Sequence, residues 1–158
     1  MYSNKIHLDK RGAFITILDN AGREKHQQVE YTITDVRNEE VFVTEDGLQY
    51  IRDSLQAKSR QRFLLDELNR IPNVIANSDI VILDPMASDD TLIYYKKIRI
   101  QPEHRHCLVA AVVKLQPGIK FLYNFHLQES GKVKGYRHDV PPKIWHLNPQ
   151  QRKKDYGL

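Results

Sequence analysis

Four strand-like segments between Ile80 and Leu127 constrain the fold more than any other feature of the sequence. They read IVILD, TLIYYKKIRI, CLVAAVVKL and IKFLYNFHL, and they are rich in β-branched and aromatic residues. The segments between them, MASDD, QPEHRH and QPG, are polar or contain proline and glycine, which favour turns. This succession predicts an antiparallel meander of four strands.

Two helical patterns precede these strands. Thr44 is suited to cap a helix whose acidic first turn complements the helix dipole, and apolar residues at helical spacing continue it to about Lys58. A second helical pattern covers residues 61–71. Pro72 is expected to end it.

The N-terminal region predicts a β-hairpin. Residues 12–18 and 29–34 are rich in β-branched and aromatic side chains, and Asp19-Asn20-Ala21-Gly22 supplies turn residues between them. The whole sequence therefore predicts an α+β fold. Two N-terminal helices would pack on one face of a four-stranded antiparallel meander, preceded by a β-hairpin.

The length of 158 residues fits a single domain, 1–158. Within it we expect the N-terminal β-hairpin in 1–40, a core in 41–137 and a basic C-terminal tail in 138–158. The tail lacks periodicity, so we expect it to be loose, with Trp145 as a residue that could pin it to the body.

Composition and hydropathy indicate the cellular location of the protein and the partners that its charge favours. No apolar run approaches the ~20 residues of a membrane span, and the N-terminus has no apolar signal core, so we expect a cytoplasmic protein with no membrane contact. Cys107 is the only cysteine, which excludes an intrachain disulfide, and we expect it in a strand core. The formal net charge of +4 weakly favours binding to polyanions.

Alternation along the expected strands separates an apolar face from a more polar one. The helices should cover the apolar face, whereas Lys96 falls on it as an inward charge unless a bulge reassigns it. Lysine and arginine can neutralise phosphates and tyrosine offers a stacking surface, so the polar face fits RNA, with a merely solvated face as the alternative. The residues of that face are Tyr95, Lys97, Arg99, Lys114, Asn124 and His126.

The stretch from Val41 to Phe125 resembles the phage-associated nucleases of the barnase/EndoU/colicin/RelE-like superfamily. The resemblance rests on FVTEDGLQYIRDSL, LLDELNRIPNVIANSDIVI, LIYYKKI, CLVAAVVK and FLYNF. It implies a metal-independent endoribonuclease fold without a cofactor, which would leave 2′,3′-cyclic phosphate ends on RNA. Similar family members carry histidines in the first helix, whereas the matching positions here are Tyr50 and approximately Leu55, with Arg52 nearby.

The missing helix histidines leave other residues as catalytic candidates. His126 is the candidate base, because an imidazole titrates near about pH 6.5. Tyr95, Lys96 and Lys97 match the family's YYK strand, where lysine could bind the scissile phosphate and tyrosine could stack or transfer a proton. The candidates for substrate binding are Arg99, Lys114, Asn124 and Arg52.

His104 and His106 form an HxH pair, but without an obvious third ligand we expect no metal site there. The basic C-terminal stretch could contact RNA, with a solvated tail as the alternative.

Two functions stay open: a ribonuclease or degenerate relative that binds RNA, and a non-enzymatic interaction module of a phage-derived or toxin-like system. A protein inhibitor or partner fits either function, and the sequence does not indicate the oligomeric state.

Overall fold

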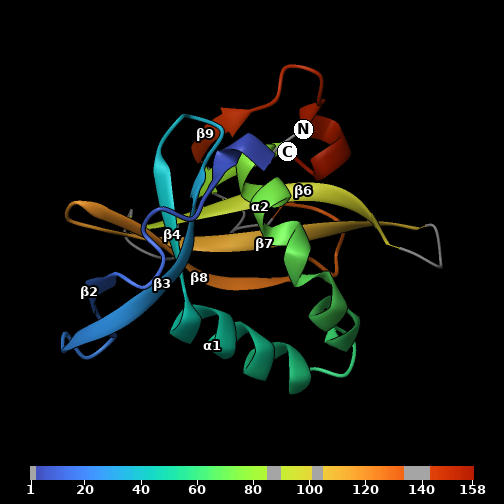
Figure 1. The fold of residues 1–158 in the computed structure, drawn as a ribbon. Coiled ribbons are helices and arrows are strands. Elements are labelled where there is room, and N and C mark those ends of the chain that lie inside the picture. The colour runs from blue at the N-terminus through green and yellow to red at the C-terminus, as the bar shows by residue number, and fades with distance from the viewer. Residues whose placement is uncertain (1–2, 85–89, 101–104, 134–142) are drawn as a thin grey trace.

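The computed structural model describes residues 3–84, 90–100, 105–133 and 143–158. These residues form one mixed sheet of nine strands in the order β1-β3-β4-β8-β7-β6-β5-β9, with β2 paired to β3 (Figure 1). The strands are β1 (Ile6–His7), β2 (Phe14–Leu18), β3 (Glu24–Thr34), β4 (Glu40–Thr44), β5 (Ile80–Leu83), β6 (Thr91–Ile100), β7 (Arg105–Gln116), β8 (Ile119–Leu127) and β9 (Lys143–Leu147).

Helical elements lie against this sheet and at the chain ends. They are η1 (Ser3–Lys5), α1 (Glu45–Gln56), η2 (Arg62–Arg70), α2 (Ile71–Ala76) and η3 (Lys153–Tyr156), where η denotes a 3-10 helix. The first expected helix is confirmed as α1: the Thr44 hydroxyl accepts a hydrogen bond from the Gly47 N–H at 2.9 Å. Pro72 does not end the second helical stretch but lies in the first turn of α2, where its missing N–H costs nothing.

The expected arrangement of two N-terminal helices on a four-stranded meander is wrong. Strands β5, β6, β7 and β8 do pair antiparallel in succession, but they form only part of the larger sheet. Four strands precede α1, and β4 joins the sheet in parallel beside β8, where Phe42 pairs with Phe121. Local periodicity cannot reveal a pairing between residues so far apart in sequence, which is why the prediction stopped at the meander.

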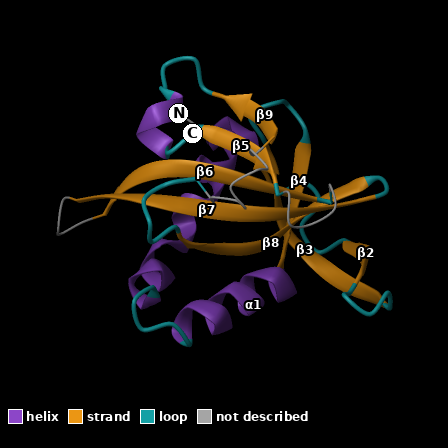
Figure 2. Cartoon of the chain, turned by 180° about the vertical axis from the view of Figure 1, so that it is seen from behind, coloured by secondary structure: helices purple, strands orange, loops and turns teal. Residues whose placement is uncertain are grey.

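The sheet has a core on each face. The larger one lies between the sheet and the helices and includes Ile51, Leu55, Tyr94 and Phe125. The second lies on the opposite face, where Val133 and Tyr156 pack on the strands. The polar face expected from alternation is therefore not open over β5, β6 and the adjoining part of β7, where Val133 and Tyr156 pack. Figure 2 shows the end of the chain beside β6.

The C-terminal residues 143–158 are not a loose tail. Strand β9 pairs antiparallel with β5, and the Tyr156 side chain is 1% exposed. The Tyr156 hydroxyl donates to Asp79 Oδ2 at 2.9 Å, and the Lys97 N–H donates to the same oxygen at 2.9 Å. These bonds hold the end of the chain against the start of β5.

Two simpler expectations can also be compared with the structure. Cys107 is buried in the helix-side core, which confirms its expected place in a strand core. None of the helices in the described part of the chain has the length and apolar character that crossing a membrane would require.

Candidate functional site: a cleft beside the β2–β3 hairpin

The residues of the expected YYK strand do not form an open site. Tyr95 is fully buried in the second core. Lys96 forms an ion pair with Asp79 at 3.5 Å and donates to the Asn77 carbonyl at 2.8 Å. Lys97 is exposed, but its ammonium lies over the Tyr156 ring at 4.5 Å. Tyr95 and Lys97 thus help to hold the second face together. Lys96 lies on the helix side of β6, as alternation predicted, because the pairing of β6 with β7 contains no bulge that would reassign it.

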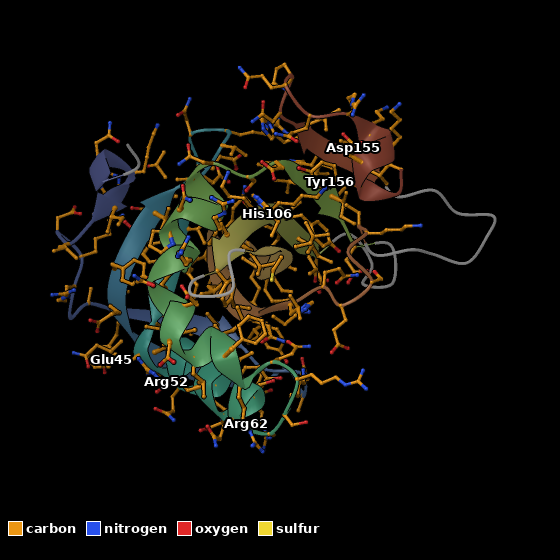
Figure 3. All side chains as sticks on the ribbon, turned by 90° about the vertical axis from the view of Figure 1, so that its right-hand side faces the viewer. Glu45, Arg52, Arg62, His106, Asp155 and Tyr156 are labelled. Atoms are coloured by element: carbon orange, nitrogen blue, oxygen red, sulfur yellow. The ribbon has the colours of Figure 1, made fainter. Side chains whose placement is uncertain are left out.

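The other candidate residues are spread over the molecule. Arg99 is exposed on β6 opposite His106, and its carbonyl accepts a hydrogen bond from Arg70 at 3.0 Å. Arg52 is exposed on α1, on the side of the molecule away from Tyr156 (Figure 3). His106 is exposed, whereas His104 lies outside the described residues.

A β-bulge in β8 changes which side chains share a face. Val112 pairs with Asn124 and Val113 with Leu122, so Tyr123 is the extra residue on β8. As a result Leu122 and Phe125 both belong to the helix-side core. Strict alternation along IKFLYNFHL would instead place Leu122 on the polar face and Tyr123 in the core, so the bulge changes both positions.

Lys114 and His126 lie far apart along the sheet. Lys114 pairs with Phe121, and His126 pairs with Ala110, four positions earlier on β7. At about 3.3 Å per strand residue, the two positions are about 13 Å apart along the sheet. Asn124 Oδ1 accepts a hydrogen bond from the Phe125 N–H at 2.9 Å, which turns this side chain back onto its own strand.

A cleft of about 660 Å³ lies where the β2–β3 hairpin, the β7–β8 turn and the first turn of α1 come together. Figures 1 and 2 show these three elements on the same side of the molecule. The side chains that line the cleft and can bind a polar ligand are Lys25, Gln27, Asp46, Tyr50, Asp90, Lys114, Gln116 and Tyr123. Of the residues expected to bind substrate, Lys114 lies here.

Lys114, Tyr123 and Tyr50 form one continuous group in this cleft. The Lys114 ammonium lies over the Tyr123 ring at 5.0 Å, and the centroids of the two tyrosine rings are 5.2 Å apart. A hydrogen bond to Tyr123 raises the pKa of the Tyr50 phenol, so Tyr50 is a neutral donor and acceptor at physiological pH. Tyr50 is 46% exposed, so its ring is accessible from solvent.

The local sequence explains why these groups meet. A Cβ atom on Gly47 would lie 3.2 Å from the Leu122 carbonyl oxygen, so glycine allows the first turn of α1 to approach β8 closely. Tyr50, one turn further along α1, therefore reaches Tyr123. The Thr44 hydroxyl donates to Gln27 Oε1 at 2.8 Å, which ties the hairpin to the start of the same helix.

The cleft carries mixed charge. Lys25 and Lys114 face it together with the carboxylates of Asp19, Asp46 and Asp90. Asp19 is occupied by the turn: hydrogen bonds from the Arg23 and Ala21 N–H groups lower its pKa. Such a lining fits a ligand that combines an aromatic ring, an anionic group and hydrogen-bond donors.

Sequence reasoning missed part of this site. Strict alternation along β8 places Tyr123 in the core, and Tyr50 was considered only as the replacement of a family histidine. Lys25 could have been found, because it alternates with Gln27 along β3 and pairs with the inward-facing Ile17. Within the described ranges, no three His, Cys, Asp or Glu side chains are grouped so that they could hold a metal ion.

Comparisons of this chain with protein-family models, with curated proteins and with solved structures find no match.

Proposed function

We propose that the chain binds single-stranded RNA and that the cleft beside the β2–β3 hairpin receives one of its nucleotides. The observation that carries the proposal is the Lys114–Tyr123–Tyr50 group. It places an ammonium beside an accessible aromatic surface. Single-stranded nucleic acids are commonly bound by this combination, because bases stack on the rings and the cation attracts the phosphate.

The carboxylates define how the nucleotide would lie. Asp46 and Asp90 would repel phosphates but can accept hydrogen bonds from the amino groups of a base. The base would therefore enter the cleft over Tyr50, while the adjoining phosphate stays near Lys114. This arrangement involves few phosphate contacts, so the affinity should depend only modestly on salt.

Binding without turnover fits the geometry better than cleavage does. Proton transfer to the 2′-hydroxyl and to the leaving oxygen needs a base and an acid close to one phosphate. Among the candidates, Tyr95 is buried, Lys97 is held over Tyr156, and His126 lies about 13 Å from Lys114 along the sheet. We therefore propose that the protein is a degenerate relative of the nucleases that retains RNA binding in the cytoplasm.

The proposal can be tested by fluorescence anisotropy with a labelled, mixed-sequence single-stranded RNA. We expect Tyr50→Ala to weaken binding by about tenfold, as loss of one stacked base does. Lys114→Ala should weaken binding and reduce the dependence of log affinity on log salt by about one. Arg52→Ala is the matched control, because Arg52 is exposed on the same helix and does not line the cleft.

The outcome for these variants decides the proposal. No measurable RNA binding by the wild-type chain would overturn it, and so would full affinity in both cleft variants. If RNA does not bind, the non-enzymatic interaction module, with a protein inhibitor or partner, becomes the better hypothesis. Pull-down with the immobilised wild-type chain and with Tyr50→Ala would then show whether a partner uses this cleft.

A further inference from the structure

The outer edge of β2 is available for strand pairing. The Val29 N–H donates to the Ala13 carbonyl at 2.8 Å and the Asp19 N–H donates to the Arg23 carbonyl at 2.9 Å, which fixes the alternation of the ladder. The backbone N–H and C=O groups of Phe14, Thr16 and Leu18 consequently point away from β3. The strand therefore presents a row of ladder groups on its free side.

A side chain already occupies one position on that row. Gln116 Oε1 accepts from the Leu18 N–H at 2.9 Å, and Gln116 Nε2 donates to the Leu18 carbonyl at 2.9 Å. A peptide group of a neighbouring antiparallel strand would form the same pair of bonds. In the part of the chain that the structure describes, no other hydrogen bond reaches this edge, so Phe14 and Thr16 are left for another strand.

The side chains of β2 lack the usual protection of a sheet edge. The strand FITIL has no charge and no proline, the two features that most often prevent edge-to-edge pairing. Phe14 is 68% exposed and Leu18 is 46% exposed. Because side chains alternate, Phe14, Thr16 and Leu18 lie on the same face of the hairpin.

We propose that β2 pairs antiparallel with β2 of a second copy of this chain, about a two-fold axis at Thr16. In this register Thr16 faces Thr16 of the second copy, and Phe14 faces Leu18 of the second copy. Each of these pairs exchanges two backbone hydrogen bonds, and each exposed apolar side chain gains an apolar neighbour. The second copy's strand replaces the Gln116 amide at Leu18.

Self-complementarity supports a second copy over an unrelated strand. The outward residues Phe14, Thr16 and Leu18 form a row that is symmetric about Thr16, so each apolar side chain meets an apolar one in this register. The flanking charges do not contribute, because Arg11 pairs with Glu30 and Arg23 with Asp19 within the chain. The strand is thus complementary to itself in backbone groups and in apolar side chains.

The dimer should be weak, because a five-residue strand forms a small interface and the Gln116 amide competes for it. We expect sedimentation equilibrium to show a concentration-dependent monomer–dimer exchange at concentrations from about 5 to about 500 µM. Thr16→Pro should abolish the dimer, because it removes an outward N–H while it leaves the backbone bonds between β2 and β3 in place. Thr16→Val is the control: like the proline variant it loses the side-chain hydrogen bond to His26, but it keeps the N–H and should dimerise like the wild type.

Gln116→Ala provides a test in the opposite direction. Removing the competing amide should strengthen the dimer several-fold. If Gln116 only stabilised the monomer, the substitution would leave the dimer affinity unchanged. A synthetic peptide of residues 13–19 should compete with the dimer. Circular dichroism of each variant confirms that the monomer is folded.

Two outcomes would overturn the proposal: a wild-type chain that stays monomeric throughout this range, and a Thr16→Pro variant that dimerises normally. No RNA is present in these measurements, so they are independent of the proposed RNA binding.

Discussion

Single residues decide how the C-terminal part of the chain is held, and sequence patterns gave little sign of it. Asp79 is 5% exposed and accepts hydrogen bonds from the Tyr156 hydroxyl and the Lys97 N–H. A buried carboxylate with such partners stabilises the contact that it forms, because leaving the partners unsatisfied would cost free energy. In the sequence, Asp79 is only a polar residue before a strand, and its partner Tyr156 lies in a stretch without periodicity.

Trp145, in the middle of β9, is likewise held by residues that sequence patterns do not reveal. Arg37 lies 4.3 Å and Lys120 4.7 Å from the Trp145 ring centroid, and Tyr94 meets the ring edge-on. The Tyr94 hydroxyl donates to Asp35 at 2.6 Å. The sequence did identify Trp145 as a residue that could pin the tail, because a large aromatic side chain is the obvious anchor, but not the cations that enclose it.

His146 makes the stability of the fold depend on pH. Partial burial lowers the pKa of its imidazole below the ordinary value of 6.5, and the positive charge of Arg37 lowers it further, while Asp35 opposes both. The unfolded chain therefore binds the proton more readily, so stability should fall as pH decreases from about 7 toward about 5. Thermal unfolding of the wild type and of His146→Asn should show a smaller decrease in the variant. An equal decrease in both proteins would contradict this assignment.

At the scale of elements, local sequence predicted what local interactions determine. The N-terminal hairpin is confirmed as β2 and β3, and the capped helix is confirmed as α1. The β8 bulge was not predicted, because nothing in IKFLYNFHL marks Tyr123 as an extra residue. That one residue changes the face of the side chains on one side of it. Of the expected RNA-binding face, Lys114 alone lines the cleft, since Tyr95, Lys97 and Arg99 lie on β6, away from this end of the sheet.

Gly47 links the element scale to the candidate site. In an exposed helix, Gly→Ala stabilises by about 1 kcal/mol through helix propensity. Here the new Cβ would lie 3.0 Å from the Thr44 hydroxyl and 3.2 Å from the Leu122 carbonyl, so α1 must move away from β8. We expect Gly47→Ala to destabilise the protein by about 1 kcal/mol in urea unfolding, as strained packing outweighs propensity. Gln56→Ala, at the end of the same helix, is the control, and a stabilised Gly47→Ala protein would refute the close approach.

At the scale of the molecule, the sheet depends on pairings between distant segments. The parallel contact of β4 with β8 and the antiparallel contact of β5 with β9 each join segments that are far apart in the chain. Neither follows from periodicity, which reports only which side of an element is apolar. Because Val133 and the η3 residue Tyr156 cover part of the second face, the open polar positions lie in the cleft at the end of the sheet.

The arrangement of these residues predicts that the protein does not cleave RNA. With excess EDTA and at any pH from about 5 to about 8, where histidine titrates, we expect a mixed single-stranded RNA to remain intact. The reason is geometric, because the buried Tyr95, the engaged Lys97 and the remote His126 cannot act on one phosphate held near Lys114. Gel analysis with scoring of the product ends measures this. Cleavage that leaves 2′,3′-cyclic phosphates and disappears in His126→Ala, but not in Lys114→Ala, would instead place an active site on the covered face and require the C-terminal segment to move aside.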